Sequence, residues 1–310
     1  MSPLDTNAVP VGPAIEPAEF SARRRQLMEA IGNDGVAIIP SSIEQTRNSD
    51  VHYPFRQDSD FRYLTGFNEP DALAVLAPGH ADGEFHLFCR QRDREREIWD
   101  GLRAGPEGVV SNYGADQGHT LDAIDTVLPK LLRGRSKVVH TLGLSSAWDQ
   151  RVLGWVNTLR AASRRGPAAP EAIVSLGTTL HEQRLIKSAG ELEMMAHAGR
   201  VSAEAHCRAM RVCQPGMTEY QIAAEIHHSF AMARMEPAYG TIVGGGANAC
   251  ILHYAETSAV LADGDLLLID AGSESDGYSP DLTPSFPPPG RLPRDHAPPH
   301  ALALAPHRAS

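Results

Sequence analysis

The chain has 310 residues, which is more than one hydrophobic core usually serves and therefore predicts two domains. Apolar residues make up 42% of it, and the formal net charge is −10. This composition excludes a disordered or fibrous chain, and the acidic balance argues against partners such as nucleic acid or an anionic membrane surface.

The sequence predicts a cytoplasmic protein. Its four cysteines show no CxxC spacing and are too sparse for a disulfide framework, so we expect reduced thiols. Residues 1–17 lack the basic and then apolar layout of a signal peptide and predict a flexible arm. No apolar run approaches the ~18 residues that cross a bilayer, so no membrane attachment is expected.

The first domain is expected at residues 18–175. Apolar residues at helical spacing lie at 20–31, 121–132 and 151–159. Arg23, Arg24 and Arg25 fall mostly outside the apolar stripe of the first of these helices. Strand-like apolar runs lie at 36–39, 73–77, 85–89 and 138–142. This alternation predicts an α/β domain with a mixed or largely parallel sheet, and the Ala-, Arg- and Pro-rich stretch 161–170 predicts a linker.

The second domain is expected at residues 176–286 and opens with two helices. Ser188 with Glu191, and Thr218 with Gln221, have the spacing of capping boxes, so helices should begin at the residues after Ser188 and Thr218. Beyond Pro237 the pattern becomes β. Strand-like runs lie at 242–243, 250–254 and 266–269. The sequence therefore predicts a helical hairpin that leads into a curved antiparallel sheet.

Residues 287–310 are rich in proline and predict a disordered or aberrant tail. Each proline inside a helix removes a hydrogen bond and costs about 3 kcal/mol, so no packed element is expected there. We therefore expect the second domain to stop before its sheet is covered.

Asp270 and Asp281 are the most informative polar pair. Asp270 ends an apolar run, and Asp281 follows the turn residues 275–277. Because their separation is odd, a two-residue hairpin places both carboxylates on one face. With 275–276 as the loop they pair directly, at Cβ distances of about 4.5–5.5 Å; with 276–277 as the loop they are diagonal neighbours at about 7–8 Å. Like charges so close favour a cation between them, although each Asp can instead cap a turn.

Two other motifs carry less information. His253 lies in the strand-like run 250–254, on the face opposite Leu252, and taken alone is typical of a hydrogen-bonded structural histidine. Gly244-Gly-Gly246 matches neither GxxxxGK[ST] nor GxGxxG, which argues against a phosphate-binding loop.

These residues belong to motifs of a known family. The first domain contains Tyr53-Pro-Phe-Arg-Gln-Asp-Ser-Asp-Phe61 and Tyr63-Leu-Thr-Gly-Phe-Asn-Glu-Pro70. The second contains Glu225-Ile-His-His228, Thr241-Ile-Val-Gly244, Cys250-Ile-Leu-His-Tyr254, Gly264-Asp-Leu-Leu-Leu-Ile-Asp-Ala-Gly272 and Gly277-Tyr-Ser-Pro-Asp281. In these motifs the chain, from about residue 19 to residue 286, resembles the Xaa-Pro aminopeptidases (aminopeptidase P) of the creatinase/prolidase group of M24 metallopeptidases. The resemblance implies an α/β N-terminal domain and an α+β "pita-bread" catalytic domain, the latter incomplete.

The resemblance also implies a site with two metal ions. Asp270 would be a carboxylate ligand, Asp281 the carboxylate that bridges two divalent ions, usually Mn²⁺, and His253 the histidine that steadies the substrate. A hydroxide between the ions would attack the carbonyl before proline in peptides with proline at the second position; other divalent ions also suit oxygen ligands. Trp99 and Arg164 resemble residues that approach a neighbouring subunit's site, which implies a homo-oligomer for the full-length protein.

The chain departs from the family at its C-terminal end. The family's remaining ligands, one His and two Glu, and the Glu that shuttles protons lie after the second Asp, where this chain has no matching segment. The resemblance therefore implies a C-terminally truncated site, and we expect this chain to be inactive as it stands. Two alternatives stay open: an inactive oligomerisation or binding module, and a prolidase that cleaves Xaa-Pro dipeptides.

Overall fold

The chain forms two compact units in a computed structural model that describes residues 12–162 and 167–288. The N-terminal unit is Ile15–Lys187, and the C-terminal unit comprises Met1–Ala14 and Ser188–Ser310. The division comes later than the expected boundary at 175/176 because α7 (Gly177–Leu185) buries Leu180 in the N-terminal core. Most of the expected arm, part of the expected linker and nearly all of the expected tail fall outside the described residues. Within those residues, no helix combines the length and the apolar content that crossing a bilayer requires.

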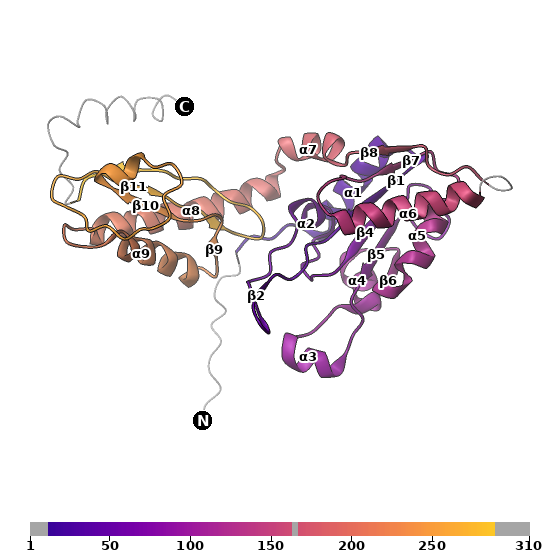
Figure 1. Ribbon diagram of the computed structural model, residues 1–310, viewed down its shortest axis with the longest axis horizontal. Helices are drawn as coiled ribbons and strands as arrows, with labels where there is room; N and C mark the ends of the chain where they lie inside the picture. Colours follow the sequence, from indigo (N-terminus) through magenta and orange to yellow (C-terminus); the bar gives the residue numbers. More distant parts are fainter. Residues whose placement is uncertain (1–11, 163–166, 289–310) are drawn as a thin grey trace. The chain divides into compact units, whose positions relative to one another are not determined.

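The N-terminal unit is built on a mixed six-stranded sheet in the order β6-β5-β4-β1-β7-β8 (Figure 1). Its strands are β1 (Gly35–Pro40), β4 (Leu73–Leu76), β5 (Phe85–Cys89), β6 (Gln117–Thr120), β7 (Lys137–Val139) and β8 (Ala172–Val174). The pairs β5–β6, β1–β7 and β7–β8 are parallel, whereas β1–β4 and β4–β5 are antiparallel. The predicted mixed sheet is therefore confirmed.

Helices cover both faces of this sheet. One core joins it to α1 (Pro17–Ile31), α2 (Ser59–Thr65), α4 (Gly105–Tyr113) and α7. The other joins it to η1 (Leu121–Ala123), α5 (Ile124–Leu132) and α6 (Ser146–Ala162). The remaining elements, the hairpin of β2 (Thr46–Asn48) and β3 (Val51–His52) and the short helix α3 (Arg94–Asp100), belong to neither core. A helix–sheet–helix arrangement of this kind buries apolar side chains on both sheet faces.

Two of the three arginines expected mostly outside the apolar stripe of α1 are buried in the N-terminal unit. Arg23 and Arg24 are 5% and 4% exposed. The Arg24 guanidinium lies 4.1 Å from the centroid of the Phe85 ring and donates to the Leu64 carbonyl at 2.9 Å. Burial lowers the pKa of Arg24 to about 10, although the charge of Asp116 acts in the opposite direction. The face of the Phe85 ring and the Leu64 carbonyl thus stabilise the charge of Arg24 inside the unit.

The C-terminal unit packs a helical hairpin on a small antiparallel sheet. The helices are α8 (Ala189–Val212) and α9 (Glu219–Met232), and the three-stranded sheet has the order β10-β11-β13, with β10 at Ile242–Gly245, β11 at Leu267–Asp270 and β13 at Ser285–Phe286. A separate pair joins β9 (Glu236–Pro237) to β12 (Ser273–Glu274). The predicted helix start after Ser188 is confirmed, since Ser188 Oγ accepts from the Glu191 amide at 3.1 Å and Glu191 returns the contact at 2.9 Å.

The expected strand at 250–254 is not formed. Instead, a 3₁₀ turn, η3 (Gly246–Cys250), follows β10 directly, and the residues up to Ser258 form neither helix nor strand. A backbone with φ of +55° at Gly246 begins this departure from the sheet. The apolar residues of this segment therefore belong to a loop rather than a strand. Leu252, for example, is 88% exposed.

Candidate metal centre

A β-ribbon carries Asp270 and Asp281 on one face. The Ser275 and Tyr278 backbones exchange hydrogen bonds of 2.9 and 3.0 Å, so Asp276 and Gly277 form the two-residue loop. Both loop residues have positive φ, 55° and 89°, as a type I′ hairpin turn requires. Farther along the ribbon, the Ala271 amide donates to the Leu282 carbonyl at 3.2 Å. This register makes the two aspartates diagonal neighbours, the second of the two arrangements that the sequence allows.

Tyr239 links the two carboxylates. Its hydroxyl donates to Asp281 Oδ1 at 3.4 Å. Burial and the negative charges of Asp270 and Asp281 raise the pKa of Tyr239. Both acids therefore surround one phenol, although they lie on different arms of the ribbon. Sequence reasoning missed this residue, because no spacing rule connects it to either aspartate.

Gly272 allows Tyr239 to reach the ribbon. The Ala238 amide donates to the Gly272 carbonyl at 2.9 Å, which extends the β9–β12 pairing up to Tyr239. A Cβ atom at Gly272 would lie 2.1 Å from the Pro280 carbonyl oxygen and 3.1 Å from the Tyr239 ring. Only a residue without a side chain lets these three segments approach so closely.

The carboxylate chemistry fits a hard divalent cation. Asp270 Oδ1 is buried and has no hydrogen-bond partner, a state that costs free energy unless another group satisfies the oxygen. A second carboxylate close by adds repulsion that a cation would relieve. Among the residues that the structure describes, no three His, Cys, Asp or Glu side chains gather closely enough to hold a metal ion. The two aspartates therefore represent only part of a ligand set.

His253 lies on an exposed turn between η3 and β11. In the described part of the chain, no hydrogen bond joins it to Asp270 or Asp281. Its neighbour Tyr254 is 7% exposed and donates to Glu219 Oε2 at 2.8 Å. The structure therefore anchors the turn through Tyr254 and leaves the imidazole of His253 open to solvent.

Gly244 and Gly245, which precede this turn, allow close packing of the backbone. A Cβ atom at Gly244 would lie 2.9 Å from the backbone of Asn248, and one at Gly245 would lie 2.5 Å from Leu261. The missing side chain at Gly244 therefore lets η3 fold back closely on β10, and the missing side chain at Gly245 makes room for Leu261. This arrangement agrees with the absence of a phosphate-loop motif.

Trp99 lies on α3, in the N-terminal unit, and is 85% exposed, so it is not a core residue. Ile98 and Leu102 beside it are 80% and 83% exposed. Arg164, the other residue expected near a neighbouring site, lies outside the described residues.

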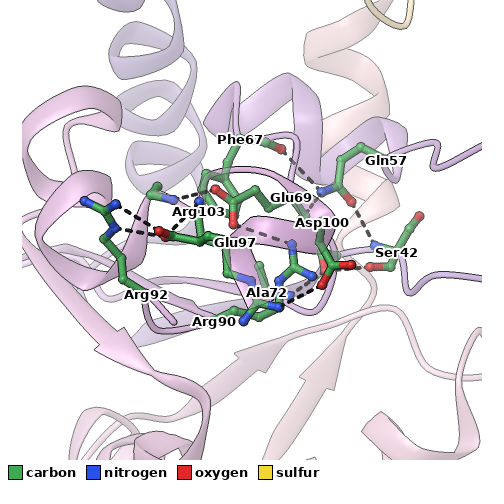
Figure 2. Close-up of polar contacts among 12 residues, drawn as sticks. Ser42, Gln57, Phe67, Glu69, Ala72, Arg90, Arg92, Glu97, Asp100 and Arg103 are labelled. Carbon is green, nitrogen blue, oxygen red and sulfur yellow. Dashed lines mark hydrogen bonds and ion pairs between the residues drawn. The ribbon is translucent and has the colours of Figure 1, made fainter. Parts of the chain in front are cut away.

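A network of ion pairs holds the base of α3 (Figure 2). Glu97 Oε1 accepts from Arg92 Nε at 3.0 Å and from the Arg103 amide at 3.2 Å. Glu69 Oε1 accepts from the Ala104 amide at 2.7 Å, and its other oxygen lies 3.7 Å from Arg90. These contacts fix both ends of a segment whose tip exposes apolar side chains.

A cavity of about 680 Å³ lies elsewhere in the N-terminal unit, beside the carboxyl ends of β1 and β7. Its walls include Ser42, Phe55, His140, Ser145 and Trp148. None of the described site residues expected from the sequence lines it. The cavity belongs to the N-terminal unit, whereas the aspartate pair belongs to the C-terminal unit.

Comparisons with known proteins find one family match in each of the two units. Residues 20–140 match the aminopeptidase P N-terminal domain, and residues 193–303 match metallopeptidase family M24. The chain is 42% identical over 277 residues to the Xaa-Pro aminopeptidase of Escherichia coli (strain K12), covering 88% of this chain and 63% of that protein. It is 29% identical over 298 residues to the human Xaa-Pro aminopeptidase 3, covering 91% of this chain and 57% of that protein.

Solved structures show the same relationship. The Pseudomonas aeruginosa aminopeptidase PepP is 49% identical and matches with a TM-score of 0.85, over 88% of this chain and 62% of that one. A His354Ala form of Escherichia coli aminopeptidase P matches with a TM-score of 0.87 at 41% identity, over 91% of this chain and 65% of that one. The chain thus spans somewhat less than two thirds of these relatives, and the expected fold class, including its incomplete pita-bread domain, is confirmed. Both parts of the sequence show that the chain belongs to the aminopeptidase P branch of metallopeptidase family M24.

Proposed function

We propose that this chain carries part of the active site of a cytoplasmic Xaa-Pro aminopeptidase, which releases the N-terminal residue of peptides with proline at the second position. The observation that carries the proposal is the convergence of Asp270 and Asp281 on Tyr239, with one Asp270 oxygen buried and unsatisfied. The names of the relatives supply the substrate class.

The residues present have distinct roles in this proposal. Asp270 and Asp281 would bind two divalent ions, with Mn²⁺ as the preferred metal. Such ions, when bound, supply Lewis acidity and a hydroxide nucleophile at neutral pH. Tyr239 orients Asp281 by donating a hydrogen bond, which leaves the other lone pairs of that carboxylate available. His253, exposed on its turn, would donate a hydrogen bond to the substrate carbonyl as negative charge develops there.

This chain supplies only part of the metal ligands, so metal binding and peptide cleavage are tested separately. Two carboxylates cannot complete two shells of about six oxygen ligands, so we expect weak but saturable Mn²⁺ binding and little or no peptide cleavage. Isothermal titration with Mn²⁺ measures the first, and release of the N-terminal residue from an Ala-Pro-Ala tripeptide measures the second. Absence of saturable Mn²⁺ binding would contradict the proposal and favour an inactive binding module. Cleavage of the dipeptide Ala-Pro in preference to the tripeptide would favour a prolidase.

The exposed tip of α3 favours a second role, self-association. We propose that Ile98, Trp99 and Leu102 contact another copy of this chain, since apolar patches held on a rigid base commonly mark interfaces. We expect Trp99→Ser to lower the sedimentation coefficient of the wild-type oligomer toward that of a monomer. Leu144→Ser, at a residue of the same unit that is 81% exposed, is the matched control and should leave it unchanged. A monomeric wild-type protein, or equal effects of the two variants, would contradict this role.

A further inference from the structure

The segment that carries His253 has no regular structure to hold it. Between η3 and the bridge formed by Val260 with Thr218, the described residues form neither helix nor strand. A surface loop of this kind is normally mobile unless its backbone and side chains are fixed by specific contacts. The position of His253 therefore needs a separate explanation.

One buried carboxylate makes most of these contacts. Glu219, the first residue of α9, is 0% exposed. Its Oε1 accepts from the Gly245 amide at 2.8 Å and from Asn248 Nδ2 at 3.0 Å. Its Oε2 accepts from the Tyr254 hydroxyl at 2.8 Å and from the Ala259 amide at 3.0 Å. The four donors lie before, within and at the end of the loop, so a single side chain closes it.

The charge of Glu219 suits this role. Burial acts to raise its pKa, but the hydrogen bonds from Gly245, Asn248, Tyr254 and Ala259 outweigh burial and lower it. The carboxylate is therefore ionised at neutral pH, and hydrogen bonds to an ionised group are stronger than neutral ones. Its place in the first turn of α9 adds a favourable interaction with the helix dipole.

We propose that Glu219 is a positioning residue that sets the orientation of His253 through Tyr254. Tyr254 points inward to Glu219, whereas the adjacent His253 is exposed, so fixing the tyrosine ring directs the imidazole outward. Asn248 strengthens the link, since its Nδ2 also donates to the Tyr254 oxygen at 3.0 Å. This inference rests on the proposed function, because it matters for catalysis only if His253 contacts the substrate.

Two variants test the link in the full chain. Glu219→Gln keeps the side-chain volume but places an amide nitrogen against a backbone donor. Tyr254→Phe removes only the hydroxyl that contacts Glu219 and Asn248. Glu225→Gln is the control: Glu225 lies on the same helix and accepts from Arg208 Nε at 2.6 Å, and within the described residues no hydrogen bond joins its side chain to the loop. Amide hydrogen exchange at residues 245–259, the ¹H–¹³C imidazole signals of His253 and thermal melting are measured for each.

We expect Glu219→Gln to speed amide exchange in the loop at least tenfold and both loop variants to shift the His253 signals toward those of free histidine. Tyr254→Phe should do this with little change in melting temperature, and Glu225→Gln should do neither. If Glu219→Gln does not fold, Tyr254→Phe decides. Unchanged His253 signals in Tyr254→Phe would overturn the inference. His253→Ala tests the proposed function separately: if it leaves binding of Ala-Pro-Ala unchanged while the loop variants behave as expected, the positioning holds and the catalytic role fails.

Discussion

Replacing Gly272 with alanine is expected to destabilise the C-terminal unit by about 3 kcal/mol. The new methyl group would lie 2.1 Å from the Pro280 carbonyl oxygen, a backbone atom that cannot rotate away. Stiffening of the unfolded chain offsets only ~0.5–1 kcal/mol of this cost. Because Pro280 precedes Asp281, relief of the clash must move one carboxylate of the pair or the Tyr239 ring. We therefore expect loss of saturable Mn²⁺ binding as well as lower stability.

The three tryptophans make this effect easy to localise. Trp99, Trp148 and Trp155 all lie in the N-terminal unit, so tryptophan fluorescence follows that unit, whereas far-UV circular dichroism follows both. Gly272→Ala should lower only the transition that fluorescence does not detect. The control is Gly199→Ala in α8, where a Cβ meets no atom within 4 Å and should stabilise by about 0.5–1 kcal/mol. Equal melting curves for Gly272→Ala and the wild type would show that the ribbon is not packed as described.

Elements with a local cause could be predicted from the sequence. The start of α8 follows from the reciprocal hydrogen bonds of Ser188 and Glu191, which lie three residues apart. The strand β5 was predicted with its observed bounds, because a short apolar run between turn residues is typical of a buried strand. In contrast, β6 is a polar edge strand that exists only through its pairing with β5, so its own residues carry no signal.

The candidate site likewise combines features that follow from local sequence with features that depend on tertiary contacts. The odd separation of Asp270 and Asp281 predicted that both carboxylates share a face of a hairpin. It left two loops open because Asp276 belongs to both, and the backbone hydrogen bonds between Ser275 and Tyr278 together with the positive φ of Asp276 and Gly277 distinguish them. Tyr239 could not be predicted, since the β9–β12 pairing that places it joins segments far apart in the chain. The contacts of Glu219 with the loop of His253 are likewise tertiary.

The second large effect is expected from Asp281→Asn. In the metal-free protein this change removes one of two like charges and should stabilise the C-terminal unit by about 0.5–1 kcal/mol. Saturating Mn²⁺ should reverse the order of stability. At a concentration of 100 times its dissociation constant, the metal adds about 2.7 kcal/mol to the wild type and nothing to a variant that does not bind it. The measurement is the melting temperature with and without MnCl₂.

Asp270→Asn is measured in the same way, because Asp270 Oδ1 is buried without a hydrogen-bond partner. Asp263→Asn serves as the matched control. Asp263 is an exposed carboxylate of the same unit in the turn before β11, and its loss should change neither the metal-free melting temperature nor the response to Mn²⁺. If both site variants lower metal-free stability, Asp270 and Asp281 act as turn caps, because a cap loses hydrogen bonds when its charge is removed. If Asp270 and Asp281 are metal ligands, both variants should be more stable than the wild type without metal and should lose the stabilisation by Mn²⁺. The reason is that a bound cation offsets the repulsion between the two carboxylates, whereas without metal this repulsion only destabilises the wild type.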